Sequence, residues 1–261
     1  MDTSSQTTII FHHIPKTAGT TLLNIVPKLY EKDGLYVIDG IETDRDVEIF
    51  KSMTLAQKSK YPVIIGHQAI MLYDHIVGEK KVVSFFREPF SQFVSDYYYL
   101  RKATHNLKHH KYVKKMSLTQ FLDYTIENNI NNPQSKVLFV PHYEDVSDEN
   151  EIFEGARKGF SKVDFPCITE DFDLSLMLLR RELGWRSWPF YTFKNRSDKK
   201  GYSFDEDVFI KHREFNKSDY EIYAKAKEVF SGKVSEQDRK QSEKFKIMNS
   251  CYRTLKRFKV I

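Results

Sequence analysis

The stretch FHHIPKTAGTT, residues 11–21, decides the fold of this 261-residue chain, because it joins two patterns of different periodicity. Residues 7–11 form a short β-branched run that predicts a strand, and apolar residues recur at helical spacing from Leu22 to Val26. A strand, a tight polar loop and a helix in that order bring the free N–H groups of the helix start to one point. Such a point binds phosphate or sulfate. The sequence therefore predicts an anion-binding loop around residue 16.

The loop differs from the two common glycine-rich nucleotide loops. Lys16 precedes Gly19 by three residues, whereas the triphosphate loop has its lysine directly after a second glycine, and no earlier glycine exists here. The dinucleotide pattern GxGxxG is also absent. Lys16 supplies a point charge, and Thr17, Thr20 and Thr21 supply hydroxyl donors. These departures argue against the interpretation of the chain as an ordinary kinase or a hydride-transfer enzyme.

Short apolar runs bounded by turn signals alternate with segments of helical spacing. The expected strands cover Thr7–Phe11, Leu35–Ile38, Val63–Ile65, Val82–Phe86 and Phe165–Ile168. The expected helices cover residues 44–60, 88–102, 117–129 and 171–184, with two or three more after residue 205. This alternation favours a mainly parallel sheet covered on both faces. We expect a single P-loop-like α/β domain of three α/β/α layers, with its core over 1–204 and a helical extension over 205–261.

Four segments resemble one family, the sulfotransferases that take sulfate from PAPS (3′-phosphoadenosine 5′-phosphosulfate); one of them, residues 169–183, resembles a downstream helix of the family. Residues 15–21, PKTAGTT, are similar to the family's 5′-phosphosulfate loop. Their sequence is most similar to that of the carbohydrate branch, which includes heparan sulfate 2-O-sulfotransferase. Residues 64–67, IIGH, resemble the strand end that carries the catalytic base, and residues 82–89 with Ser95 resemble the 3′-phosphate segment. The resemblance implies a metal-independent transferase of the EC 2.8.2 type, with PAPS as the donor and PAP as the product.

Sulfuryl transfer resembles phosphoryl transfer in that positioning and electrostatic stabilisation provide most of the catalysis. Lys16 can stabilise the negative charge of the leaving phosphate. We expect His67 to be the general base, because imidazole titrates near neutrality and His67 follows a strand. The resemblance assigns the 3′-phosphate to Arg87 and Ser95, which suits a planar bidentate donor and a hydroxyl. The residues expected to bind the donor are Pro15, Lys16, Thr17, Ala18, Gly19, Thr20, Thr21, Arg87 and Ser95.

The candidates on the acceptor side rest on weaker patterns. The basic run over residues 101–115 can contact an anionic glycan, although a solvated loop explains it equally well. Residues 132–135 resemble a family segment near the acceptor cleft, although a helix start with proline explains them equally well. The expected acceptor contacts are His13, Arg101, Lys102, Asn132 and Gln134. A late loop over the adenosine is expected to use Asn195, Arg196, Ser197, Lys199, Lys200 and Gly201. His12 and His13 are expected to pack at the strand end, with either as the alternative base.

The composition of the chain limits the classes of protein to which it can belong. Lys plus Arg number 41 against 36 for Asp plus Glu, and this net charge of +5 suits an anionic ligand without requiring nucleic acid. Two cysteines, Cys167 and Cys251, indicate a fold that does not depend on disulfides. The chain shows neither a signal-peptide pattern nor an 18-residue apolar run. We therefore expect a cytoplasmic protein with no membrane span; a chain trimmed of a Golgi-type anchor is the competing explanation.

Two other classes of function remain open from the sequence. A P-loop kinase of small molecules would need a Mg²⁺ ligand and a lysine at the usual spacing, and neither is found. A non-catalytic protein that binds a nucleotide or a glycan through the same loop would not need both Lys16 and His67. No cluster of His, Cys, Asp and Glu has metal-ligand spacing. The identity of the acceptor and the oligomeric state are not encoded in these patterns.

Overall fold

The computed structural model describes residues 7–38, 40–102, 110–192 and 206–258. The chain divides into two compact units, which are described separately here. The first unit comprises residues 1–86, 162–194 and 225–261, and the second comprises residues 87–161 and 195–224. This division differs from the expected boundary after residue 204, because the last helix buries Phe245 in the core of the first unit.

A five-stranded parallel sheet forms the centre of the first unit. Its strands are β1 (Thr8–His12), β2 (Leu35–Ile38), β3 (Val63–Gly66), β4 (Lys80–Phe86) and β5 (Phe165–Ile168), in the order β2-β3-β1-β4-β5. Every neighbouring pair is parallel. The five strands predicted from the apolar runs are confirmed, with shifts of at most two residues at their ends.

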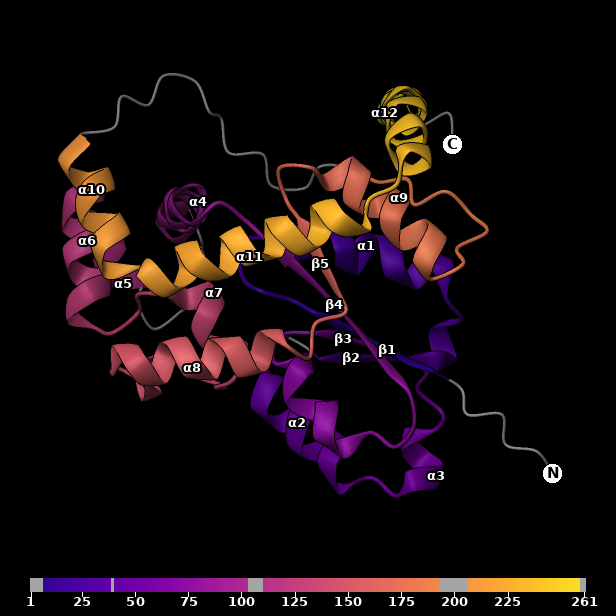
Figure 1. Cartoon of the computed structure of the whole chain (residues 1–261), viewed down its shortest axis with the longest axis horizontal. Helices are drawn as coiled ribbons and strands as arrows, with labels where there is room; N and C mark the ends of the chain where they lie inside the picture. The colour runs from indigo at the N-terminus through magenta and orange to yellow at the C-terminus, as the bar shows by residue number, and fades with distance from the viewer. Residues whose placement is uncertain (1–6, 39, 103–109, 193–205, 259–261) are drawn as a thin grey trace. The chain divides into compact units, whose positions relative to one another are not determined.

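Helices cover both faces of this sheet, as the α/β/α prediction requires. They are α1 (Gly19–Leu29), α2 (Thr43–Ser52), α3 (Leu55–Lys58), α9 (Phe172–Glu182) and α12 (Glu236–Arg257). In Figure 1, α1 and α9 lie on one side of the sheet, and α2 and α3 lie on the other. The core on the first side joins Phe11 of β1, Leu22 of α1, Leu176 of α9 and Phe245 of α12. The fold is therefore of the three-layer type.

The single helix expected over residues 44–60 is wrong, because the chain breaks at Met53 and Thr54. Thr54 has an extended backbone, and its side chain accepts a hydrogen bond from the Gln57 N–H group while the Gln57 side chain caps the Thr54 N–H group. Such a reciprocal capping box starts a new helix. No helix within the described ranges has the length and apolar character needed to cross a bilayer.

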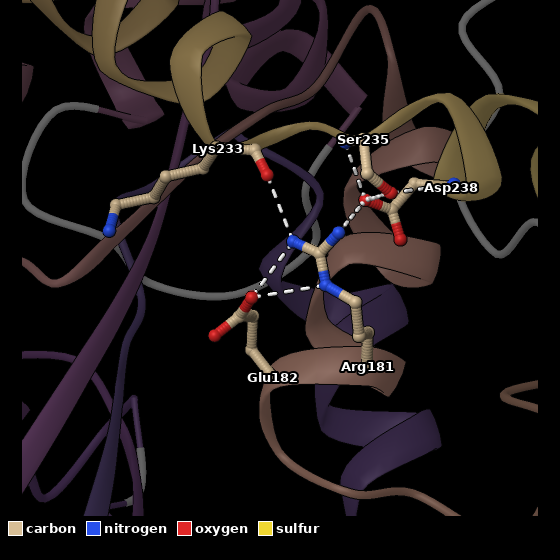
Figure 2. A network of polar contacts seen from close by, with 5 residues as sticks. All are labelled: Arg181, Glu182, Lys233, Ser235 and Asp238. Carbon is tan, nitrogen blue, oxygen red and sulfur yellow. Dashed lines mark hydrogen bonds and ion pairs between the residues drawn. The ribbon is translucent and has the colours of Figure 1, made fainter.

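Arg181 of α9 ties that helix to the start of α12, as Figure 2 shows. Its guanidinium donates to the Asp238 carboxylate and to the Lys233 carbonyl oxygen. Asp238 is only 1% exposed, and its carboxylate also accepts a hydrogen bond from the Ser235 N–H group at 2.8 Å, which caps the start of α12. The buried Asp238 carboxylate therefore pairs with Arg181 and also caps the first turn of α12.

Replacing Asp238 with alanine is expected to lower the free energy of unfolding by about 2–3 kcal/mol, because the variant loses a helix cap and the buried one of the two carboxylates that pair with Arg181. Urea denaturation measures this loss. Glu236→Ala is the matched control: Glu236 lies in the same helix turn, is 75% exposed in its side chain, and is 3.9 Å from Lys240. Its loss is expected to stay within about 0.5 kcal/mol. Equal losses for the two variants would contradict the role given to Asp238.

The second unit is helical in its described residues. Its helices are α4 (Pro89–Lys102), α5 (His110–Val113), α6 (Leu118–Glu127), α7 (Pro133–Lys136), α8 (Glu149–Phe160) and α10 (Glu206–Phe215), and α11 (Lys217–Lys233) begins in it. Its apolar core gathers Phe90, Phe93, Phe121 and Leu122. His212 of α10 is 3% exposed and packs its ring against Phe90 and Phe93. Burial lowers the pKa of His212 to about 3.

This buried imidazole should make the protein sensitive to acid. The unfolded chain binds a proton at His212 near pH 6.5, whereas the folded chain does so only near pH 3, so stability falls as the pH drops below 6.5. Between pH 7 and pH 5 the contribution of His212 is about 2 kcal/mol. Denaturation at several pH values is expected to show a shallower loss for His212→Leu than for the wild type. Parallel pH profiles of the two proteins would refute this assignment.

Candidate active site

The loop between β1 and α1 has an unusual backbone. Lys16 (φ 64°) and Ala18 (φ 71°) both adopt the left-handed conformation, and Ala18 is the N-cap of α1. A residue with a Cβ is strained there, and such strain concentrates at functional sites. Left-handed and right-handed residues in succession turn their N–H groups toward one concavity, which binds anions. The loop is therefore shaped around a point that attracts negative charge.

Four consecutive main-chain donors in this loop are available to a ligand. The N–H groups of Thr17, Ala18, Gly19 and Thr20 find no acceptor among the described residues. The Thr21 N–H group is the next in line and donates to the Ala18 carbonyl oxygen at 2.9 Å. Main-chain donors at a helix start, the positive end of the helix dipole and a lysine are the features that an anion site requires, so the geometry is compatible with the predicted site.

Thr17 holds the loop rather than presenting its hydroxyl to a ligand. This side chain is 1% exposed, and its Oγ1 donates to the Ile14 carbonyl oxygen at 2.8 Å. The Thr17 carbonyl oxygen in turn accepts from the Thr169 hydroxyl, which follows β5, at 3.2 Å. The Thr17 hydroxyl, which was expected to donate to phosphate, is therefore already hydrogen-bonded inside the loop. Thr17 can still bind an anion through its main-chain N–H group. Sequence reasoning did not find the supporting role of Thr169.

Two imidazole rings lie beside the anion loop. The ring of His13 stacks on the ring of His67, with centroids 4.0 Å apart and planes 28° from parallel. The strand register explains this contact: His12 of β1 pairs with Gly66 of β3, so the residues that follow both strands meet at one edge of the sheet. The His13 N–H group continues the ladder to the Gly66 carbonyl oxygen at 2.9 Å. The structure therefore brings the predicted base and the predicted loop together.

The ring of His13 also covers Gly19, the first residue of α1. A Cβ at Gly19 would lie 1.7 Å from Cδ2 of His13, which explains why the residue there is glycine. Burial, followed by the charges of His67, His12 and Lys16, lowers the pKa of His13 well below its ordinary value. His13 therefore stays neutral at physiological pH. The ring fills the space between loop and base, as its expected packing role requires.

The predicted 3′-phosphate residues lie in the second unit. Arg87 follows the last residue of β4 directly and is half-buried, and Ser95 lies half-buried on α4. Two residues expected at the acceptor, Arg101 and Lys102, are exposed at the end of α4. The Arg101 guanidinium donates to the Tyr97 hydroxyl at 2.9 Å. The expected late loop, Asn195 to Gly201, lies outside the described residues, as do residues 103–109.

Asn132 and Gln134 do not suit the acceptor role expected of them. They are 3% and 0% exposed, and their carboxamides are bonded inside the protein. Asn132 Nδ2 donates to the Phe215 carbonyl oxygen, and its Oδ1 accepts from the Asp219 N–H group. The Gln134 carboxamide bonds to the main chain of Arg87. Burial and internal pairing thus correct the sequence-based assignment of these two residues.

The fold and the loop define the class of protein: a three-layer α/β protein with a main-chain anion site at the start of its first helix. The chain belongs to the Sulfotransferase family, whose family model matches residues 1–226. A search of curated proteins gave no match for the chain. Membership in this family supports sulfuryl transfer in general, and the family implies PAPS as the sulfate donor together with a separate acceptor.

Proposed function

We propose that this protein transfers a sulfuryl group from PAPS to a hydroxyl group of a carbohydrate. One observation carries the proposal: the row of available N–H groups from Thr17 to Thr20 lies beside the stacked rings of His13 and His67. An anion-binding loop and a proton acceptor at one sheet edge are what transfer to a hydroxyl needs. The resemblance of PKTAGTT and IIGH to the carbohydrate branch supports a sugar acceptor.

Each group at this edge has a part in the proposed reaction. The donor supplies the sulfuryl group, whose bond to the phosphate oxygen breaks as a bond to the acceptor oxygen forms. His67 takes the proton of the attacking hydroxyl, and Lys16 stabilises the negative charge that grows on the departing phosphate. The main-chain donors of residues 17–20 hold the anionic oxygens throughout. The products are the sulfate ester and PAP.

We further propose that Arg87 and Ser95 bind the 3′-phosphate that distinguishes PAPS from an ordinary adenine nucleotide. A guanidinium forms two parallel hydrogen bonds with a phosphate, and a hydroxyl adds a third. The exposed basic end of α4, with Arg101 and Lys102, suits an anionic glycan as the acceptor.

Nucleotide binding tests this function directly. 3′,5′-ADP is expected to raise the melting temperature of the wild type more than 5′-AMP at the same concentration, because a ligand of the folded state stabilises it by mass action. Arg87→Ala is expected to lose most of the response to 3′,5′-ADP and to keep the response to 5′-AMP. Arg157→Ala, an exposed arginine of α8, is the control. Equal responses of the wild type to the two nucleotides would refute PAPS as the donor. If the wild type prefers 3′,5′-ADP, a screen of acceptors with labelled PAPS identifies the sugar.

A further inference from the structure

Gln134 holds the main chain of Arg87 from both sides. Its Nε2 donates to the Arg87 carbonyl oxygen at 2.8 Å, and its Oε1 accepts from the Arg87 N–H group at 3.0 Å. The side chain of Gln134 is fully buried. These two bonds fix the backbone orientation of Arg87, and with it the direction in which the guanidinium can extend.

Gln134 is itself immobilised by a buried carboxylate. The N–H groups of Gln134 and Ser135 donate to the two oxygens of Asp219 at 3.1 Å and 2.7 Å. Asp219 is 1% exposed, and its own N–H group donates to Asn132. Burial raises the pKa of Asp219 to about 6, so the carboxylate is charged at neutral pH and accepts both donors. A carboxylate at the start of α7 thus sets the position from which Gln134 reaches Arg87.

The backbone just after Arg87 is held as well. The Glu88 carboxylate accepts the N–H groups of Phe90 and Ser91 at 3.1 Å and 2.6 Å, and so caps the first turn of α4. Arg87 therefore lies between a capped helix start and the end of β4, with Gln134 bonded to its peptide groups. A side chain whose backbone is fixed on both sides loses less freedom when it binds a ligand.

We infer that Gln134 is a positioning residue that aims Arg87 and thereby sets the preference for a nucleotide with a 3′-phosphate. The inference rests on the proposed function of Arg87. Gln134 touches no ligand in this scheme, and its effect passes through the peptide groups of Arg87. Its loss should therefore weaken the binding of 3′,5′-ADP selectively, and should leave 5′-AMP, which has no 3′-phosphate, almost unchanged.

The Gln134→Glu variant offers a test with its own internal reference. A carboxylate accepts from the Arg87 N–H group but cannot donate to the Arg87 carbonyl oxygen, whereas a carboxylic acid can do both. Protonation therefore restores the lost bond, and a buried glutamate takes up its proton at a higher pH than an exposed one. Titration calorimetry at pH 7.5 and at pH 5.5 compares the two states of residue 134. Asp219, whose pKa is about 6, takes up a proton over the same range in both proteins, so the wild type is measured at both pH values and only the ratio of the two affinities is compared.

At pH 7.5 the variant is expected to bind 3′,5′-ADP about tenfold more weakly than the wild type, the loss that one hydrogen bond represents. At pH 5.5 the ratio of the two affinities is expected to fall toward one. The variant Gln134→Leu should lose affinity for 3′,5′-ADP at both pH values. Gln120→Glu, the same substitution at an exposed position of α6, should bind as the wild type does.

Several results would overturn the inference. One is an unchanged preference for 3′,5′-ADP in Gln134→Glu, another is an equal loss for 3′,5′-ADP and 5′-AMP, and a third is a deficit that does not shrink at pH 5.5. If Gln134→Leu does not fold, the two pH values of Gln134→Glu decide the matter alone. A wild type that binds 3′,5′-ADP no better than 5′-AMP would instead refute the proposed function, so the two failures are distinguishable.

Discussion

Lys16→Ala is expected to lower the rate of sulfuryl transfer at least about a hundredfold while the protein remains folded. Loss of one group that stabilises developing charge in a preorganised site has an effect of this size. Lys16 has a left-handed backbone, and alanine carries the same Cβ, so the substitution removes the ammonium group without changing the backbone strain. Initial rates with labelled PAPS at saturating donor measure the effect.

Two comparisons separate the charge of Lys16 from its other contributions. Lys28→Ala removes an exposed lysine from the last turn of α1, the helix that follows the loop, and should leave the rate unchanged. Lys16→Arg retains a positive charge in a different shape and should be intermediate. A Lys16→Ala enzyme that turns over at the wild-type rate would remove the loop from the mechanism.

His67→Ala is expected to reduce the transfer rate by about two to four orders of magnitude, the range that general base catalysis contributes. Its affinity for 3′,5′-ADP should change far less, because His67 acts on the acceptor proton. His67→Phe should be equally inactive although it retains a ring to stack on His13. That second variant separates the loss of a proton acceptor from the loss of packing.

An exposed histidine of the same unit provides the reference for His67. His75→Ala, at the end of the short helix Ala69–His75, should be fully active. His13→Phe tests the alternative base: it should keep activity if His67 takes the proton, and should lose it if His13 does. A His67→Ala enzyme with reduced affinity for nucleotide and an unreduced rate would contradict the role of base.

The strands and the anion loop were predictable because their signals are local. A mainly apolar run of three to five residues marks each strand of the sheet, and the loop joins a strand to a helix directly. The place of His67 beside the loop depends on β1 and β3 being neighbours in the sheet. The sequence indicated His67 through its resemblance to the family, and not through this strand order.

The roles of Gln134 and Thr169 were not predictable, because their partners lie far away in the sequence. Gln134 bonds to Arg87 across 47 positions and to Asp219 across 85, and Thr169 bonds to Thr17 across 152. A glutamine after a helix-starting proline looks the same whether it meets a substrate or a peptide group. The split of residues 44–60 into two helices was missed for a different reason, since its capping box is local but weaker than the helical spacing around it.

The donors of the anion loop belong to the main chain, and this has a consequence for inhibition. Substitutions at residues 17, 18 and 20 exchange side chains but preserve the N–H groups, unless proline is introduced. An inhibitor that binds these N–H groups with a phosphate mimic would therefore leave few routes to resistance. Substitution of Gly19 is not a route to resistance either, because any larger residue there collides with His13.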